Sequence, residues 1–123
     1  MKQPSRNIAE SNDPRRIIIL GSTGSIGVGA LDVVEHLAAA EKRPGESTPT
    51  FEVVGLAAGR RGDVLEKQAD RFSVRDVALA DPGAASALST DRSIRTGPDA
   101  AVRLVEDLAR PGDLVVAAMV GAA

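Results

Sequence analysis

The chain has no cysteine, one histidine, two phenylalanines, and neither tryptophan nor tyrosine among its 123 residues. The lack of cysteine excludes disulfides, thiolate catalysis and cysteine metal sites. A single histidine, His36, also excludes a metal site built from several histidines. With so few aromatic side chains, the core must be built from Val, Leu, Ile and Ala.

The chain also lacks a basic excess and a long apolar run. Its 15 Lys and Arg against 17 Asp and Glu give a net charge of -2, and nucleic-acid binders usually carry a positive excess. No apolar run approaches the roughly 20 residues of a membrane span, and residues 1–14 contain no hydrophobic signal core. We therefore expect neither a nucleic-acid nor a membrane partner, a disordered polar lead-in over residues 1–14, and a cytoplasmic protein.

A short apolar run and three glycines stand out. Ile17 to Leu20 is the kind of β-branched run that suits a strand buried on both faces of a parallel sheet. Gly21, Gly24 and Gly27 follow at G-x-x-G-x-x-G spacing. Such a turn needs backbone angles that residues with a side chain disfavour. A phosphate group can approach the backbone closely only where no side chain covers it. The third glycine lets the following helix pack closely on the strand.

The residues between these glycines favour a phosphate ligand. Hydroxyls of Ser22, Thr23 and Ser25 add donors, and the free N–H groups of a helix start attract an anion. An ordinary strand–helix turn is the alternative, but the strand before and the helix after favour dinucleotide binding. The helix is predicted from Ile26, with one inward apolar stripe: Ile26, Ala30, Val33, Val34 and Leu37.

Further strands and helices alternate along the rest of the chain. Strands are predicted at Phe51–Ala58, Asp76–Ala80, Ser93–Thr96 and Leu114–Val120, with an exposed loop at Pro44–Thr50. One helix is predicted from an Asp63 cap to about Asp70, with Leu65, Ala69 and Phe72 inward, and another from an Asp81 cap over Pro82–Ser89. A third is predicted to start at Gly97–Pro98 and to end at Pro111–Gly112, with the stripe Ala101, Leu104, Val105 and Leu108.

This alternation predicts an α/β fold: a Rossmann-like doubly wound parallel sheet in three αβα layers. Ligands of such sheets bind beyond the carboxyl ends of the strands. We expect one such domain over residues 15–123, truncated after the fifth strand.

The end of the second predicted strand bears on cofactor choice. An NAD site usually has an acidic residue there for the ribose 2′-hydroxyl, whereas this chain has Arg60 and Arg61. A guanidinium can pair with a 2′-phosphate through two hydrogen bonds, which favours NADP; a solvated pair of surface arginines is the alternative.

The sequence offers no catalytic residue. No two carboxylates have the pattern of an acid–base couple, and His36 is most simply a surface residue near a helix C-terminus.

These residues resemble the start of 1-deoxy-D-xylulose 5-phosphate reductoisomerases. The resemblance rests on the following stretches in order: Ile18–Gly27, Leu31–Val34, Phe51–Arg60, Gln68 with Phe72, and Ala117–Ala123. It implies NADPH-dependent isomerisation and reduction of deoxyxylulose phosphate to methylerythritol phosphate, an early step towards isoprenoid precursors.

The resemblance also implies roles for individual residues. Contacts to the phosphates and ribose of NADPH would come from Thr23, Gly24, Ser25 and Ile26, and the 2′-phosphate would be held by Gly59, Arg60 and Arg61. The family often has asparagine at the position of Arg61. Its divalent metal ligands (Mg or Mn), substrate-phosphate site and lid lie beyond residue 123, so this chain would be the cofactor-binding part of a longer enzyme, a homodimer acting on a phosphorylated sugar.

Two other functions fit the same glycine pattern. One is the cofactor domain of another dehydrogenase, such as the aspartate-semialdehyde type. The other is a nucleotide-binding module without chemistry, against which the uncovered last strand argues.

Overall fold

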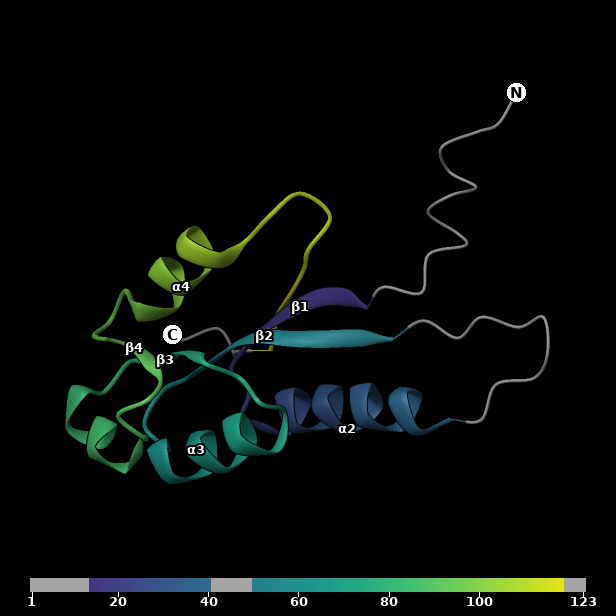
Figure 1. The fold of residues 1–123 in the computed structure, drawn as a ribbon. Helices are drawn as coiled ribbons and strands as arrows, with labels where there is room; N and C mark the ends of the chain where they lie inside the picture. The colour runs from purple at the N-terminus through teal and green to yellow at the C-terminus, as the bar shows by residue number, and fades with distance from the viewer. Residues whose placement is uncertain (1–13, 41–49, 119–123) are drawn as a thin grey trace.

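The computed structural model describes residues 14–40 and 50–118, which form a single parallel sheet with helices on both faces (Figure 1). Its strands are β1 (Arg15–Leu20), β2 (Phe51–Ala58), β3 (Asp76–Leu79), β4 (Ser93–Thr96) and β5 (Leu114–Ala117). The helices are α2 (Ser25–Ala39), α3 (Gly62–Arg71), the 3-10 helix η1 (Pro82–Ala87) and α4 (Ala100–Leu108). The predicted Rossmann-like α/β fold is confirmed.

The strand order reverses direction at β1. Every neighbouring pair is parallel, and the order across the sheet is β4-β3-β2-β1-β5. The chain therefore moves outward from β1 in one direction and then returns across the sheet to place β5 on the other side of β1. This is the topological switch point at which doubly wound sheets bind ligands, beyond the carboxyl ends of the strands.

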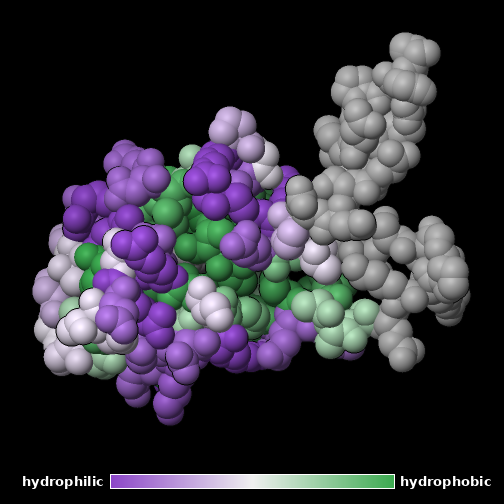
Figure 2. All heavy atoms as spheres, in the orientation of Figure 1, coloured by the Kyte–Doolittle hydropathy of each residue, from purple (hydrophilic) through white to green (hydrophobic). Residues whose placement is uncertain are grey.

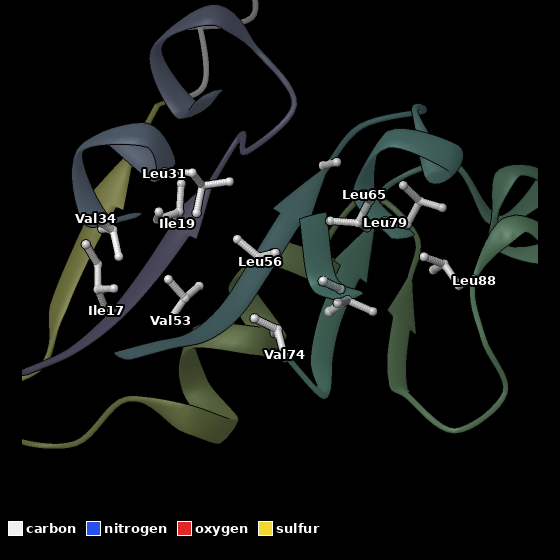
Figure 3. Packing of buried hydrophobic residues seen from close by; sticks show 13 residues of the cluster. Ile17, Ile19, Leu31, Val34, Val53, Leu56, Leu65, Val74, Leu79 and Leu88 are labelled. Atoms are coloured by element: carbon white, nitrogen blue, oxygen red, sulfur yellow. The ribbon is translucent and has the colours of Figure 1, made fainter. Parts of the chain in front are cut away.

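The alternating side chains of β1 build a core on each face of the sheet. Ile17 and Ile19 belong to the cluster that includes Leu31 and Val34 of α2, and Figure 3 shows Val34 beside Ile17 and Leu31 beside Ile19. Ile18 packs on the opposite face, in the cluster that contains Leu104 of α4. In Figure 1, α2 and α3 lie below the sheet and α4 above it.

The predicted inward stripe of α2 is only partly right. Ile26 and Val33 are 63% and 58% exposed, whereas Leu31 and Val34 are buried together with Gly27. The reason lies at Gly27, because only a residue without a side chain fits against the turn after β1. The helix places this glycine on the sheet, and this orientation turns Ile26 and Val33 outward.

Several predicted boundaries also shift. Asp63 does not cap α3: the helix begins at Gly62, which packs so closely on η1 that a Cβ would lie 2.3 Å from the Ala84 carbonyl oxygen. Asp81 does cap the next helix, accepting a hydrogen bond from the Gly83 N–H at 2.9 Å, but that helix is 3-10 and ends at Ala87.

The remaining elements follow the prediction more closely. α4 starts at Ala100 instead of at the predicted Gly97–Pro98, and Leu104 is buried while Ala101, Val105 and Leu108 are partly buried. β3 ends at Leu79, one residue before the predicted end, and β5 runs from Leu114 to Ala117. The lead-in over residues 1–13, most of the loop at 44–50, and the end of the last predicted strand lie outside the described residues.

The face of the molecule that Figure 2 shows, in the orientation of Figure 1, has a band of hydrophobic side chains between hydrophilic ones above and below. Among the described elements, the helices are too short or too polar to cross a membrane.

An ion pair joins α3 to the segment before β4. Arg92 donates to both carboxylate oxygens of Glu66 at 2.8 and 3.0 Å, and to the carbonyl of Val74 at 2.6 Å. The hydrogen bond from Arg92 is the main reason why the pKa of Glu66 lies below its ordinary value of 4.5, and the Ser89 N–H adds to it.

This pair predicts an acid-sensitive contribution to stability. Because the folded-state pKa of Glu66 is lowered, its contribution is present above pH 4.5 and is lost as pH falls from there through the depressed value. Glu66→Gln should lower stability at neutral pH and should reduce the loss of stability on acidification. Denaturant unfolding at a series of pH values checks this, with Glu106→Gln, an exposed carboxyl of α4, as control. An unchanged pH dependence in Glu66→Gln would contradict it.

Candidate functional site

The turn after β1 is held by the neighbouring strand. Gly21 has a positive φ of 83°, a conformation that glycine adopts without strain. The N–H groups of Gly21 and Ser22 both donate to the carbonyl of Ala57 in β2, at 2.8 and 2.9 Å. The turn closes through the Gly24 N–H, which donates to the Gly21 carbonyl at 3.2 Å. The first glycine therefore has the role that the spacing predicted.

The third glycine also has its predicted role. A Cβ on Gly27 would lie 2.2 Å from the Gly21 carbonyl oxygen and 2.6 Å from the Ser22 Cα. These contacts are far inside van der Waals distance, so α2 sits directly on the turn. This brings the start of the helix to the carboxyl end of β1.

Ser22 does not have the role that the sequence predicted for it. Its side chain is fully buried, and its hydroxyl donates to Oε1 of Gln68 in α3 at 2.7 Å. The Gln68 Nε2 in turn donates to the Ser22 carbonyl at 2.8 Å. The hydroxyl of Ser22 is therefore used inside the protein and is not presented to a ligand.

The next residues line the open side of the turn. Thr23 is half-buried, and Gly24, Ser25 and Ile26 are exposed. Gly24 is the N-cap of the 15-residue helix α2, without a capping side chain and with no acidic residue in the first turn. The first helical hydrogen bond is that of the Val28 N–H, which donates to the Gly24 carbonyl at 2.8 Å. The preceding N–H groups and the positive end of the helix dipole suit an anion here.

Gly24 is unlike the other two glycines of the turn. Its φ is -81°, which any residue can adopt, and a Cβ there would meet only the Gly21 carbonyl oxygen, at 3.6 Å. Neither backbone strain nor packing within the described residues requires a glycine at this position. What glycine does provide there is an uncovered backbone on the solvent side.

The second set of predicted residues lies at the end of the adjacent strand. Leu20 and Ala57 are paired across β1 and β2, so the turns after these strands share one edge of the sheet. Gly59, Arg60 and Arg61 are exposed in the turn after β2, and no atom would lie within 4 Å of a Cβ on Gly59. Within the described residues, neither arginine has an ion-pair partner.

The site thus joins a helix start suited to an anion with two exposed guanidinium groups on the next strand. The sequence predicted both parts, but Gln68 entered only as part of the family resemblance and was given no role in the site. The signal for it was a polar residue on the inward stripe of α3, between Leu65 and Ala69, where an apolar residue is the usual choice.

Other candidate sites are weaker. His36 is exposed in the last turn of α2, and over residues 14–40 and 50–118 no three His, Asp or Glu side chains gather as a metal site would require. A cavity of about 360 Å³ lies at the opposite edge of the sheet, between the starts of β2 and β3 and the end of α4. Its lining includes Arg16, which is paired with Asp113, and Asp76, which is paired with Arg95, and it is separate from the glycine-rich turn.

A doubly wound parallel sheet with a glycine-rich turn at its switch point defines the class of Rossmann-like nucleotide-binding domains. Within this class, residues 17–123 match the family model of 1-deoxy-D-xylulose 5-phosphate reductoisomerase, and the chain belongs to this family. The match favours neither the aspartate-semialdehyde dehydrogenase alternative nor a module without chemistry.

Curated relatives agree with the family match. The chain is 47% identical over 117 residues to the reductoisomerase of Mycolicibacterium smegmatis, which covers 93% of this chain and 26% of that protein. It is 40% identical over 113 residues to that of Rhodococcus jostii, covering 91% and 25%. The chain therefore spans about a quarter of the length of these relatives.

Solved structures of members of this family show the same fold. The reductoisomerase of Zymomonas mobilis in complex with NADPH is 28% identical, with a TM-score of 0.59 over 76% of this chain and 23% of that one. A reductoisomerase in complex with magnesium aligns with a TM-score of 0.66 at 24% identity, over 89% of this chain and 26% of that one.

Proposed function

We propose that this chain binds NADPH across the carboxyl ends of β1 and β2, as the cofactor-binding part of a 1-deoxy-D-xylulose 5-phosphate reductoisomerase. Family membership and the NADPH complex of the Zymomonas mobilis relative support the cofactor. The observation that carries the proposal is the pairing of an open helix start at Gly24 with Arg60 and Arg61 on the adjacent strand.

In this proposal the two parts of the site recognise opposite ends of one cofactor segment. The backbone N–H groups of Thr23, Ser25 and Ile26 would receive the pyrophosphate, and the bare backbone at Gly24 would let it approach. The exposed guanidinium groups of Arg60 and Arg61 would pair with the 2′-phosphate, and Gly59 would leave space beside them. The exposed side chain of Ile26 would add an apolar surface beside the cofactor.

The whole enzyme would isomerise and reduce deoxyxylulose phosphate to methylerythritol phosphate, with a hydride supplied by NADPH. This reaction leads towards isoprenoid precursors. The sugar phosphate, a divalent Mg or Mn ion and a second subunit would be its other partners. No group of residues in the described part fits the metal, so no chemical step is assigned to this chain.

A fluorescence titration of the chain with NADPH and NADH tests the proposal, with circular dichroism to verify folding. We expect saturable binding that favours NADPH. Gly24→Val should leave the fold intact, because its φ is allowed and its Cβ would have no close contact. It should still weaken NADPH binding about tenfold or more, since the side chain would stand between the phosphate and the backbone N–H groups.

Gly29→Val is the matched control, because Gly29 lies in the same helix with nothing within 4 Å of a Cβ and away from the turn. Absence of binding by the folded chain would overturn the proposal. Equal affinities of the two valine variants would show that the cofactor lies elsewhere.

A further inference from the structure

Two polar residues are buried as a whole in the described part of the chain, Ser22 and Gln68, and their side chains are bonded to each other. Gln68 is 8% exposed and lies between the buried Leu65 and Ala69 on the inward side of α3. Burying an amide in such a place costs free energy unless its hydrogen bonds are satisfied. A methionine of similar shape would fit the apolar surroundings without this cost. The glutamine therefore indicates a specific hydrogen-bond partner.

That specific partner is the backbone and the side chain of one residue in the glycine-rich turn. The Gln68 amide accepts from the Ser22 hydroxyl at 2.7 Å and donates to the Ser22 carbonyl at 2.8 Å. The N–H of Ser22 is bonded on its other side to Ala57 of β2. The turn is thus fixed between the sheet and α3, by residues 46 positions apart in the sequence.

The helix that carries Gln68 also follows the arginine loop. α3 begins at Gly62, directly after Arg60 and Arg61. The Gln68–Ser22 pair therefore connects the helix behind the arginines to the turn that faces the pyrophosphate. A shift of α3 against this turn would change the spacing between the two halves of the site.

We propose that Gln68 is a positioning residue that sets the affinity for NADPH by fixing the glycine-rich turn relative to the Arg60–Arg61 loop. It does so without touching the cofactor, because its side chain is buried behind Ser22. This inference rests on the proposed NADPH site. It has its own readout in the rigidity of the turn, which can be measured without cofactor.

Gln68→Met tests the proposal, since it keeps the shape and removes both hydrogen bonds. We expect the amides of Gly21 and Ser22 to exchange with solvent faster, and NADPH to bind about tenfold more weakly, because two buried groups of the turn lose their partners. Lys67→Met is the matched control, with the same new side chain on the exposed face of α3. Both are measured at a temperature where circular dichroism shows complete folding.

Gln68→Glu gives a readout that a purely structural role would not move. When protonated, its carboxyl group can donate to the Ser22 carbonyl; when ionised, it places an oxygen against that carbonyl. Relative to the unsubstituted chain, its affinity for NADP⁺ should fall as pH rises from about 5.5 to 8.5, because burial and the carbonyl favour the neutral form. Ser22→Ala, which keeps the carbonyl contact, should show a smaller loss and serves if Gln68→Met does not fold.

The outcomes separate the two proposals. If the unsubstituted chain does not bind NADPH, the proposed function fails, and the exchange of the Gly21 and Ser22 amides alone decides whether Gln68 fixes the turn. If it binds but Gln68→Met has an unchanged affinity, or the exchange of these amides is unchanged, the positioning role is overturned.

Discussion

Gly27→Ala should destabilise the protein by about 3 kcal/mol or more, the upper end of what overpacking usually costs. The added methyl carbon would lie 2.2 Å from the Gly21 carbonyl oxygen, 2.6 Å from the Ser22 Cα and 2.9 Å from the Gly21 carbonyl carbon. All three are backbone atoms, which cannot rotate away as a side chain could. The helix α2 must therefore move off the strand, and the buried contacts of Leu31 and Val34 move with it.

The chain offers a matched control for this change in the same helix. A Cβ on Gly29 would have no atom within 4 Å, and Gly29 is exposed. Gly29→Ala should therefore stabilise the protein by roughly 0.5–1 kcal/mol, the ordinary gain of alanine over glycine in a helix. Urea unfolding followed by circular dichroism measures both. Similar unfolding midpoints for the two variants would contradict the tight packing of α2 on the turn.

The contrast between these two glycines shows what the sequence can and cannot predict. The G-x-x-G-x-x-G spacing after an apolar run correctly predicts the strand, the turn and the close approach at Gly27. It does not predict the rotation of α2. Hydrophobicity alone places Ile26 and Val33 inward, whereas the contact at Gly27 determines the face and leaves both exposed.

The parallel sheet was predictable for a similar reason. Buried strands such as Ile17–Leu20 are recognisable by their β-branched runs, and alternation with helices implies parallel pairing. The residues at which the helices begin were harder to predict. Asp63 has the residue type of a cap, but α3 begins at Gly62, which packs against Ala84, and its N-cap is Arg61, two residues before the predicted cap.

The candidate site also has parts that a local sequence pattern predicts and parts that depend on packing between distant residues. Local pattern indicated Thr23 to Ile26 and the arginines, whose part in cofactor binding stays a prediction. The use of the Ser22 hydroxyl could not be read locally, because its partner Gln68 lies 46 residues away. A hydroxyl beside a glycine-rich turn suits a phosphate or a buried amide equally well, and only the packing of α3 against the turn decides between them.

Arg60→Glu should change the choice of cofactor more than any other single substitution in the site. The 2′-phosphate is the one group that NADPH has and NADH lacks at this end. Replacing an exposed guanidinium by a carboxylate removes a charge-assisted pair and adds repulsion. We expect NADPH to bind about 100-fold more weakly, or about 2.7 kcal/mol, while the affinity for NADH changes little.

Two further charge reversals make this result specific. Arg75→Glu makes the same change in net charge at the opposite edge of the sheet, so it controls for a general loss of attraction between the protein and an anionic cofactor. Arg61→Glu tests the neighbouring arginine, which is also the N-cap of α3. Equal losses for NADPH and NADH in Arg60→Glu would exclude pairing with the 2′-phosphate. A selective loss in Arg61→Glu alone would assign that pairing to Arg61 instead, so the ratio of the two affinities identifies which guanidinium reads the cofactor.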